Sequence, residues 1–179
     1  MSAFVRACIA LLKNGRLKIK NGNRFKCSLL NTYSASTEIK IHRGGQMSLG
    51  EHISALNDVT ISVASGAELS IGKHVNFNKS CSVIAKERVE IGDYVIFGPN
   101  CSVYDHDHDY QYTGRERQEK FVTKSVKIGN GVWFGANCVV LKGTTIGDNC
   151  VFGAGCIIKG EYPESTLVVQ KRENVLKKI

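Results

Sequence analysis

The sequence predicts an all-β fold in which short parallel strands stack into a solenoid, and three observations support this prediction. Bulky apolar residues recur every six residues toward the C-terminal end, and no helix repeats with that period. They are Ile128, Phe134, Val140, Ile146, Phe152 and Ile158. A glycine, suited to a tight bend, directly follows four of these six residues. The same spacing occurs upstream, in Ile71, Phe77, Val83 and Val89 and again in Ile91, Phe97 and Val103.

A period of six is a multiple of the strand's period of two, so every bulky side chain points to the same side of its strand. Such a unit buries its apolar side chain only against further copies of itself. Three units make one triangular turn of chain, and stacked turns form a parallel β-helix. The repeat covers residues 49–159, and its first part, over 49–69, is looser.

The 179 residues fit a single domain, 1–179, with a sizeable core. We expect an N-terminal segment with the first coils over 1–40, the β-helix over 41–160, and a C-terminal tail over 161–179. Either terminal segment can contain a short helix. The repeat is interrupted once, and the interruption predicts a loop that protrudes from the β-helix at about 104–125.

An apolar run from Phe4 to Leu12 is too short to span a bilayer, and no cleavage site follows it. We therefore expect a docking helix in a cytoplasmic protein. Because Arg16, Lys18 and Lys20 follow this run, peripheral contact with a membrane is the alternative.

Five of the seven cysteines occupy the same place in the repeat, four residues after a bulky member. They are Cys81, Cys101, Cys138, Cys150 and Cys156. Sister units carry valine or threonine there, so we expect small buried side chains that are neither bridged nor metal-bound. The odd number of cysteines agrees with a reducing compartment.

The formal net charge of +8 favours an anionic partner, such as coenzyme A or a nucleotide-linked sugar. Nucleic acid is not expected, because aromatic residues are not interleaved with the basic ones and none of the usual motifs is present. A solvated basic surface without a dedicated partner is the simplest alternative.

The interrupting segment 104–125 is polar, charged and aperiodic, and loops of this kind carry function more often than the scaffold does. His106 and His108 lie where it leaves the repeat, between Asp105, Asp107 and Asp109. An imidazole, with an unperturbed pKa near ~6.5, can remove the proton from a hydroxyl that attacks a thioester. Backbone N–H groups at glycine-rich corners can stabilise the resulting oxyanion.

With these features the chain resembles the hexapeptide-repeat acyltransferases, and within them the O-acetyltransferases that modify sugars and polysaccharides. The resemblance rests on the repeat, on the corner Gly98-Pro99-Asn100, and on the segment 129–135, which reads GNGVWFG. It implies a left-handed β-helix, a homotrimer, acetyl-CoA as the donor and a saccharide as the acceptor. The implied reaction is direct attack of a sugar hydroxyl with a histidine base, in surface polysaccharide biosynthesis (capsule, O-antigen or exopolysaccharide).

The resemblance also implies roles for particular residues. Counted from the corner at Gly98, the family's base falls on His108, with His106 as the second choice. Acceptor contacts fall on Asn78, Asp107 and Tyr110. Contacts to coenzyme A fall on Trp133, Gly135, Ala136, Gly153, Ala154, Lys159, Lys171 and Arg172.

Some of these residues have simpler explanations. Trp133 can cover a seam between subunits, and Asn78 can be a corner residue in the left-handed backbone region. The chain also departs from the family pattern, because Lys86 stands near the place of an acceptor-binding carboxylate and residues 168–173 lack the usual Gly-x-Pro-Ala.

Two other functions fit the fold. One is a zinc-dependent γ-carbonic-anhydrase-like protein, which would use histidines as ligands. However, His106 and His108 are crowded together while His42, His52 and His74 lie coils away, so no metal is expected. The other is a non-catalytic β-helix subunit, which would need neither the histidine loop nor the tryptophan corner.

Overall fold

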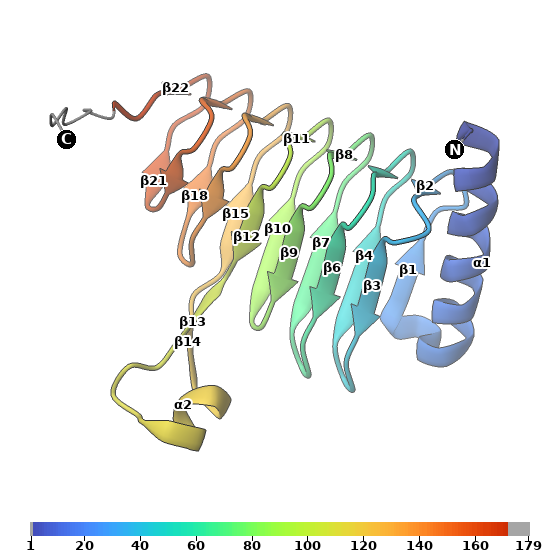
Figure 1. Ribbon diagram of the computed structural model, residues 1–179, viewed down its shortest axis with the longest axis horizontal. Helices are drawn as coiled ribbons and strands as arrows, with labels where there is room; N and C mark the ends of the chain where they lie inside the picture. Colours follow the sequence, from blue (N-terminus) through green and yellow to red (C-terminus); the bar gives the residue numbers. More distant parts are fainter. Residues whose placement is uncertain (1, 172–179) are drawn as a thin grey trace, which may run out of the picture.

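The computed structural model describes residues 2–171, which form a three-sided parallel β-helix with a helix across its N-terminal end and a hairpin arm (Figure 1). Each coil contributes one short strand to each of three sheets, which we call faces A, B and C. The predicted β-helix is therefore confirmed.

The three faces follow one another along the chain. Face A contains β1 (Phe25–Cys27), β4 (Gln46–Leu49), β7 (Glu68–Ile71), β10 (Arg88–Ile91), β15 (Val126–Ile128), β18 (Thr145–Ile146) and β21 (Glu161–Tyr162). Face B contains β2 (Thr32–Tyr33), β5 (Ser54–Ala55), β8 (Asn76–Phe77), β11 (Ile96–Phe97), β16 (Trp133–Phe134), β19 (Val151–Phe152) and β22 (Leu167–Val168). Face C contains β3 (Glu38–Ile41), β6 (Thr60–Val63), β9 (Ser82–Ala85), β12 (Ser102–Tyr104), β17 (Val139–Val140) and β20 (Ile157–Ile158).

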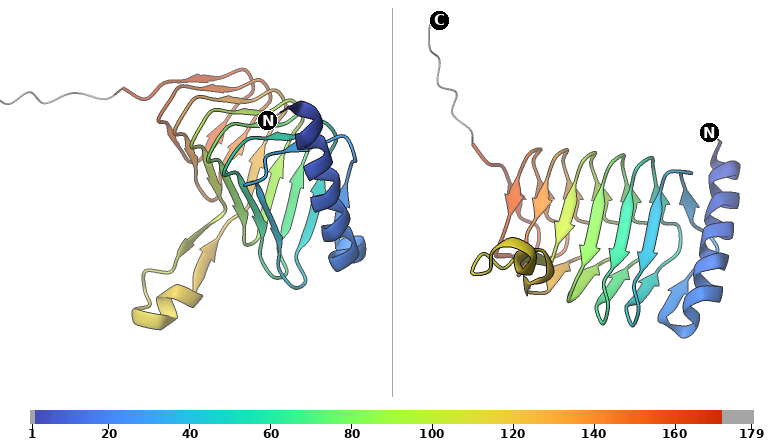
Figure 2. Two further views of the ribbon diagram at one scale, coloured as in Figure 1. Left: turned by 45° about the vertical axis from the view of Figure 1, so that its right-hand side comes forward. Right: turned by 60° about the horizontal axis from the view of Figure 1, so that its bottom comes forward.

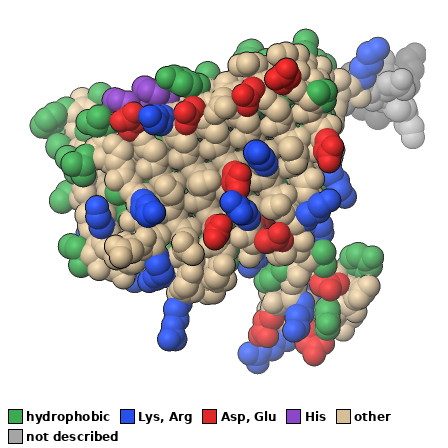
Figure 3. Space-filling view, turned by 180° about the vertical axis from the view of Figure 1, so that it is seen from behind, with side chains coloured by type: hydrophobic (Ala, Val, Ile, Leu, Met, Phe, Trp, Pro, Cys, Tyr) green, Lys and Arg blue, Asp and Glu red, His purple; other side chains and the backbone are tan. Residues whose placement is uncertain are grey.

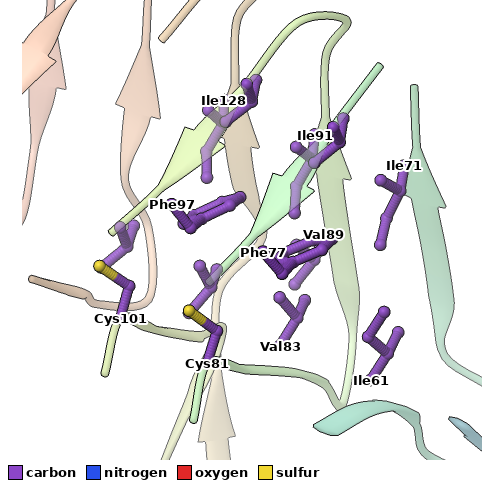
Figure 4. Packing of buried hydrophobic residues seen from close by; sticks show 14 of the residues in the cluster. Ile61, Ile71, Phe77, Cys81, Val83, Val89, Ile91, Phe97, Cys101 and Ile128 are labelled. Carbon is purple, nitrogen blue, oxygen red and sulfur yellow. The ribbon is translucent and has the colours of Figure 1, made fainter. Parts of the chain in front are cut away.

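The six-residue repeat produces columns of inward-pointing side chains inside the prism, and four successive members of one column are phenylalanines. Phe97 pairs in register with Phe77 on one side and Phe134 on the other, so their rings stack with centroids 4.9 Å apart on both sides. Phe152 continues the column at 5.2 Å from Phe134. Figure 4 shows part of this core, with Phe77 and Phe97 beside the aliphatic side chains. Because each coil is covered by the next, these rings are fully buried.

The corners between the faces are tight, and glycine is required where they stack. A Cβ atom on Gly135 would lie 2.6 Å from the backbone nitrogen of Ala154 in the next coil. Asn100 and Asn137 occupy the left-handed region in the same row of corners, with φ of 59° and 58°, and asparagine tolerates that conformation. The five cysteines expected to be buried are buried, and their thiols are free.

The coils extend further than the expected core of 41–160. They begin at β1, within the segment 1–40 where the first coils were expected. At the other end they continue through β21 and β22, so the first part of the segment expected to be a tail forms regular strands. The six-residue pattern is harder to recognise in this part of the sequence. Its bulky positions are occupied by Tyr162 and Val168, and neither residue is followed by a glycine.

The protruding segment is a β-hairpin rather than an irregular loop. Strand β13 (His106–His108) pairs antiparallel with β14 (Phe121–Thr123), and helix α2 (Gly114–Glu119) lies at the tip. Figure 2 shows this arm leaving the prism between faces C and A. The arm has no six-residue repeat because its strands do not stack on the coils.

Asp105 fixes the base of the arm. Its buried carboxylate accepts hydrogen bonds from the backbone N–H groups of Lys86, Glu87 and Arg88, at 2.8 Å in each case. Its backbone carbonyl accepts the N–H of Lys124, where the second hairpin strand returns. The Asp105 side chain therefore joins the preceding coil to the start of the hairpin. The hydrogen bond from Lys124 to the Asp105 carbonyl joins the two strands of the hairpin at its base.

Helix α1 (Ala3–Asn21) lies across the first coil, as expected for a docking helix. The Ser2 side chain caps its N-terminus by accepting from the N–H of Val5. Lys13 secures it to the coil, because its ammonium group donates to the carbonyls of Ala35, at 2.8 Å, and Thr37. Among residues 2–171, no helix is both long enough and apolar enough to cross a membrane.

We predict that Phe97→Ala lowers the free energy of unfolding by about 3–5 kcal/mol, because it leaves a cavity in the middle of the ring column. Ile96→Ala, one residue earlier but on the outer side of the same strand, should cost less than about 1 kcal/mol. Denaturant unfolding measures both. Equal losses for the two variants would contradict the stacked column as the main source of stability.

We predict that Asp105→Asn destabilises the protein by about 3 kcal/mol, because the corner N–H groups lose a buried anionic acceptor. Trypsin should also cut the arm faster, since Arg115, Arg117 and Lys120 lie beyond the weakened base. The control is Asp107→Asn, which removes an exposed carboxylate and should cost less than about 1 kcal/mol. Unchanged cleavage of Asp105→Asn would show that Asp105 does not hold the arm.

Candidate active site

The two loop histidines lie on the first strand of the hairpin arm and differ in their surroundings. His108 is exposed, and its Nδ1 lies 2.7 Å from the backbone oxygen of Arg117. Because a carbonyl can only accept, Nδ1 must carry the proton, and Nε2 is left as the basic nitrogen. The ring packs on Phe121 with centroids 4.5 Å apart. His108 is thus an oriented imidazole with an available acceptor nitrogen.

His106 is enclosed at the base of the arm. Its side chain is only 13% exposed, and its Nδ1 lies 3.0 Å from the buried carboxylate of Asp105. Its ring lies nearly perpendicular to the rings of Tyr104 and Phe121, with interplanar angles of 81° and 80°. This histidine therefore extends the Asp105 anchor, and the same carboxylate fixes its tautomer with the proton on Nδ1.

Asp107 and Tyr110, two of the expected acceptor contacts, are also on the arm. The carboxylate of Asp107 lies 2.7 Å from the ammonium of Lys142, in the corner of the following coil. The Tyr110 side chain is exposed, and its backbone oxygen accepts from Arg117. The structure thus places four of the predicted site residues on one arm.

A groove with a volume of about 470 Å³ runs beside the arm at the edge where face C meets face A. His42, Ala64, Ser65, Lys86, Glu119 and Phe121 line it. The ammonium of Lys86 lies 3.5 Å from the centroid of the Phe121 ring. Burial lowers the pKa of Lys86, and the nearby Asp105 carboxylate partly offsets this effect. From the sequence, Lys86 was noted only as a departure from the family pattern. Nothing in the sequence indicated that Phe121 would line this groove.

The remaining expected contacts form a second group at a different edge. Gly135, Ala136, Gly153 and Ala154 lie in the corners between faces B and C. Asn78 occupies the same row two coils earlier, since the N–H of Asn78 donates to Phe97, that of Gly98 to Phe134, and that of Gly135 to Phe152. Trp133 is exposed on face B beside this row. We call this group the B–C row.

Asn78 is not a left-handed corner residue. The positive φ in its corner belongs to Ser80, at 58°, so that alternative reading is wrong. The Asn78 side-chain oxygen accepts from the N–H of Lys79, and the residue lines a shallow pocket of about 280 Å³ with Arg6 and Ile96.

The basic residues expected to contact the donor phosphates are spread out. Lys159 follows β20 and is exposed at the edge between faces C and A, away from the B–C row. Lys171 is exposed beyond β22, and Arg172 lies outside the described residues.

The predicted residues thus form two groups on different edges of the prism. The arm projects between faces C and A, whereas Trp133 and the glycine corners lie on face B and at its border with face C. One chain does not bring the histidines to the tryptophan. A site that uses both groups needs a second copy of the chain.

The other histidines offer no assembled metal site within residues 2–171, where no group of three His, Cys, Asp or Glu side chains is arranged to hold an ion. His52 and His74 stack at 4.8 Å between ring centroids, and Tyr94 continues the stack, on corners between faces A and B. His42 lies in the groove beside the arm.

Comparison with known proteins agrees with the repeat. The family model for the bacterial transferase hexapeptide (six repeats) matches residues 125–160. Galactoside O-acetyltransferase of Escherichia coli K12 is 31% identical over 131 residues, which cover 73% of this chain and 63% of that protein. WbbJ of the same organism, assigned as an O-acetyl transferase of lipopolysaccharide biosynthesis, is 24% identical, over 77% of this chain and 74% of that protein.

A further relative, Rv3034c of Mycobacterium tuberculosis, assigned as an acetyltransferase, is 30% identical over 50% of this chain. This chain spans only 30% of its length.

Solved structures share the fold. AntD, an N-acyltransferase from Bacillus cereus, has been crystallised as a variant with dTDP and coenzyme A, and it superimposes with a TM-score of 0.64. The match has 20% identity and covers 83% of this chain and 79% of AntD. The match over residues 125–160, the three-sided β-helix and the sequence relatives thus make the chain similar to the hexapeptide-repeat transferases.

Proposed function

We propose that the protein is an acetyl-CoA-dependent O-acetyltransferase that acts on a sugar hydroxyl. The observation that carries this proposal is the hairpin arm, which presents an oriented imidazole, His108, whose Nε2 is available as a base. The similarity to galactoside O-acetyltransferase and to WbbJ supports both the reaction and the class of acceptor.

In the proposed reaction, Nε2 of His108 takes the proton of the acceptor hydroxyl while the oxygen attacks the thioester carbonyl. The tetrahedral intermediate then collapses, the C–S bond breaks, and the thiolate of coenzyme A takes the proton from the imidazolium. The products are the acetyl ester and free coenzyme A. Because a thiolate leaves readily, no covalent intermediate on the enzyme is needed.

His108 suits the role of base better than His106, because a base must reach the hydroxyl. His108 is exposed, whereas His106 is enclosed by two aromatic rings and tied to Asp105. We assign His106 a positioning role: it holds the first strand of the arm against the coil. Asp107, Tyr110 and Asn78 remain candidates for contacts to the acceptor.

We propose a homotrimer in which the arm of one copy lies against the B–C row of its neighbour. Such an assembly would bring His108 to Trp133, Gly135 and Gly153, and the acetyl donor would lie between the two copies. The separation of these groups within one chain favours this arrangement. Lys159, Lys171 and Arg172 remain candidates for contacts to the donor phosphates.

The acceptor we propose is a saccharide unit of a surface polysaccharide, or a precursor of one, and the similarity to WbbJ supports this choice. We place the reaction in the cytoplasm, where free thiols such as those of the buried cysteines stay reduced.

We predict that His108→Asn lowers the release of free thiol from acetyl-CoA, in the presence of acceptor, by about two to four orders of magnitude. Affinity for coenzyme A should not change, because the proposed role of His108 is proton transfer. His52→Asn, at an exposed histidine on a corner between faces A and B, is the matched control and should keep full activity, since its φ of 57° is one that asparagine tolerates. If His108→Asn is fully active and His106→Asn is inactive without being destabilised, the base is His106 instead.

We predict that two inactive variants restore activity when they assemble together. His108→Asn lacks the base, and the double variant Asn78→Ala/Trp133→Ala lacks the opposite side of the site. In mixed assemblies, about a quarter of the interfaces carry an intact arm against an intact B–C row, so about a quarter of wild-type activity should return. Thiol release by the co-expressed variants, compared with each variant alone, measures this. No recovery in verified mixed assemblies would contradict a site shared between copies.

A further inference from the structure

Helix α1 has two different long faces. Ala10, Asn14 and Asn21 are buried on one face, and Leu17 packs against the core beside them. The opposite face is also apolar, although nothing in residues 2–171 covers it. Its exposed hydrophobic residues are Phe4, Val5, Leu11, Leu12 and Ile19.

The exposed apolar residues form two rows, which lie about 100° apart around the helix axis. Residues seven apart in a helix are displaced by only about 20° around its axis. Phe4 and Leu11 therefore make one row, and Val5, Leu12 and Ile19 make the other. Leu12 and Ile19, in the second row, are 70% and 88% exposed. Figure 3 shows hydrophobic side chains gathered at this end of the rod.

Positive charge borders the apolar rows. Lys18 continues the first row, and Arg16 and Lys20 lie on the other side of the second, all three exposed. No acidic residue occurs in the chain before Glu38. Glu38 lies on the first coil and lines a pocket with Arg16, but its carboxylate pairs with Lys40 at 2.7 Å. Lys13 is different, because it donates to backbone carbonyls of the first coil.

We propose that the outer face of α1 binds the surface of an anionic lipid membrane. Apolar side chains would enter the region between headgroups and acyl chains, and Arg16, Lys18 and Lys20 would contact the anionic headgroups. A second copy of the chain is a poorer occupant, because pairing α1 with α1 through this face would bring the same basic residues together. The inference does not depend on the proposed acetyl transfer.

The position of α1 suits this role. The helix lies across the end of the rod, so it can rest on a membrane while the arm and the B–C row stay in water. Leu29 and Leu30 are exposed on the first coil next to the helix, where Asn14 contacts Ser28, and they widen the apolar surface. In the proposed trimer with parallel rods, three such helices would lie at one end, and their binding would be multivalent.

Sedimentation of the whole protein with vesicles tests the proposal without acetyl-CoA or acceptor. We expect binding to vesicles of phosphatidylglycerol and phosphatidylcholine, weaker binding at high salt, and little binding to phosphatidylcholine alone. Leu12→Glu/Ile19→Glu should weaken binding to the anionic vesicles at least about tenfold. Arg16→Gln/Lys18→Gln, which keeps the apolar rows, should weaken it less and remove most of the salt dependence.

The matched control is Ile157→Glu/Leu167→Glu, which adds the same charges near the other end of the rod, at residues that are 56% and 69% exposed. It should bind as the wild type does. The proposal is overturned if the wild type does not sediment with anionic vesicles, or if both double glutamate variants lose binding equally. It is also overturned if Leu12→Glu/Ile19→Glu dissociates an oligomer in the absence of lipid, because the face would then be a protein interface.

Discussion

The structure depends on the stacking of one coil upon the next. A six-residue unit points two side chains inward, such as Val132 and Phe134, and only the coils above and below can bury them. The column of Phe77, Phe97, Phe134 and Phe152 shows the result, with successive rings about one strand spacing apart. The close approach also explains the corners, where Gly135 is needed because its neighbour's backbone occupies the space of a Cβ atom.

A rod built in this way is rigid, and it can carry an insertion without losing its register. The chain leaves face C after Tyr104 and returns to face A at Val126, where β15 pairs with β10 as if the coil had been continuous. Asp105 makes this possible, because its buried carboxylate binds the corner of the preceding coil at the point of departure. His106 contacts that anchor directly, and β13, which carries both histidines, begins one residue after Asp105.

The same rigidity separates the chemical groups of a single chain. Face B and the edge between faces C and A lie on different sides of the prism, and stacked coils cannot twist to bring them together. Catalysis by residues from both places therefore requires assembly, which agrees with the exposure of Trp133. Helix α1 lies at the end of the rod, so contacts made there need not interfere with contacts made along its sides.

The six-residue spacing was sufficient to predict the β-helix, its inward residues and the place of the arm. The six-residue spacing has one periodic solution, and it predicted the burial of Phe97 and of Cys101 from position alone. It could not show that 104–125 is a hairpin, because pairing within that segment leaves no mark in the repeat. Which groups share an edge became apparent from the folded chain, since neighbours along a column lie a whole coil apart in sequence. It placed Lys86 on the Phe121 ring, enclosed His106 while exposing His108, and put Trp133 on another side of the prism.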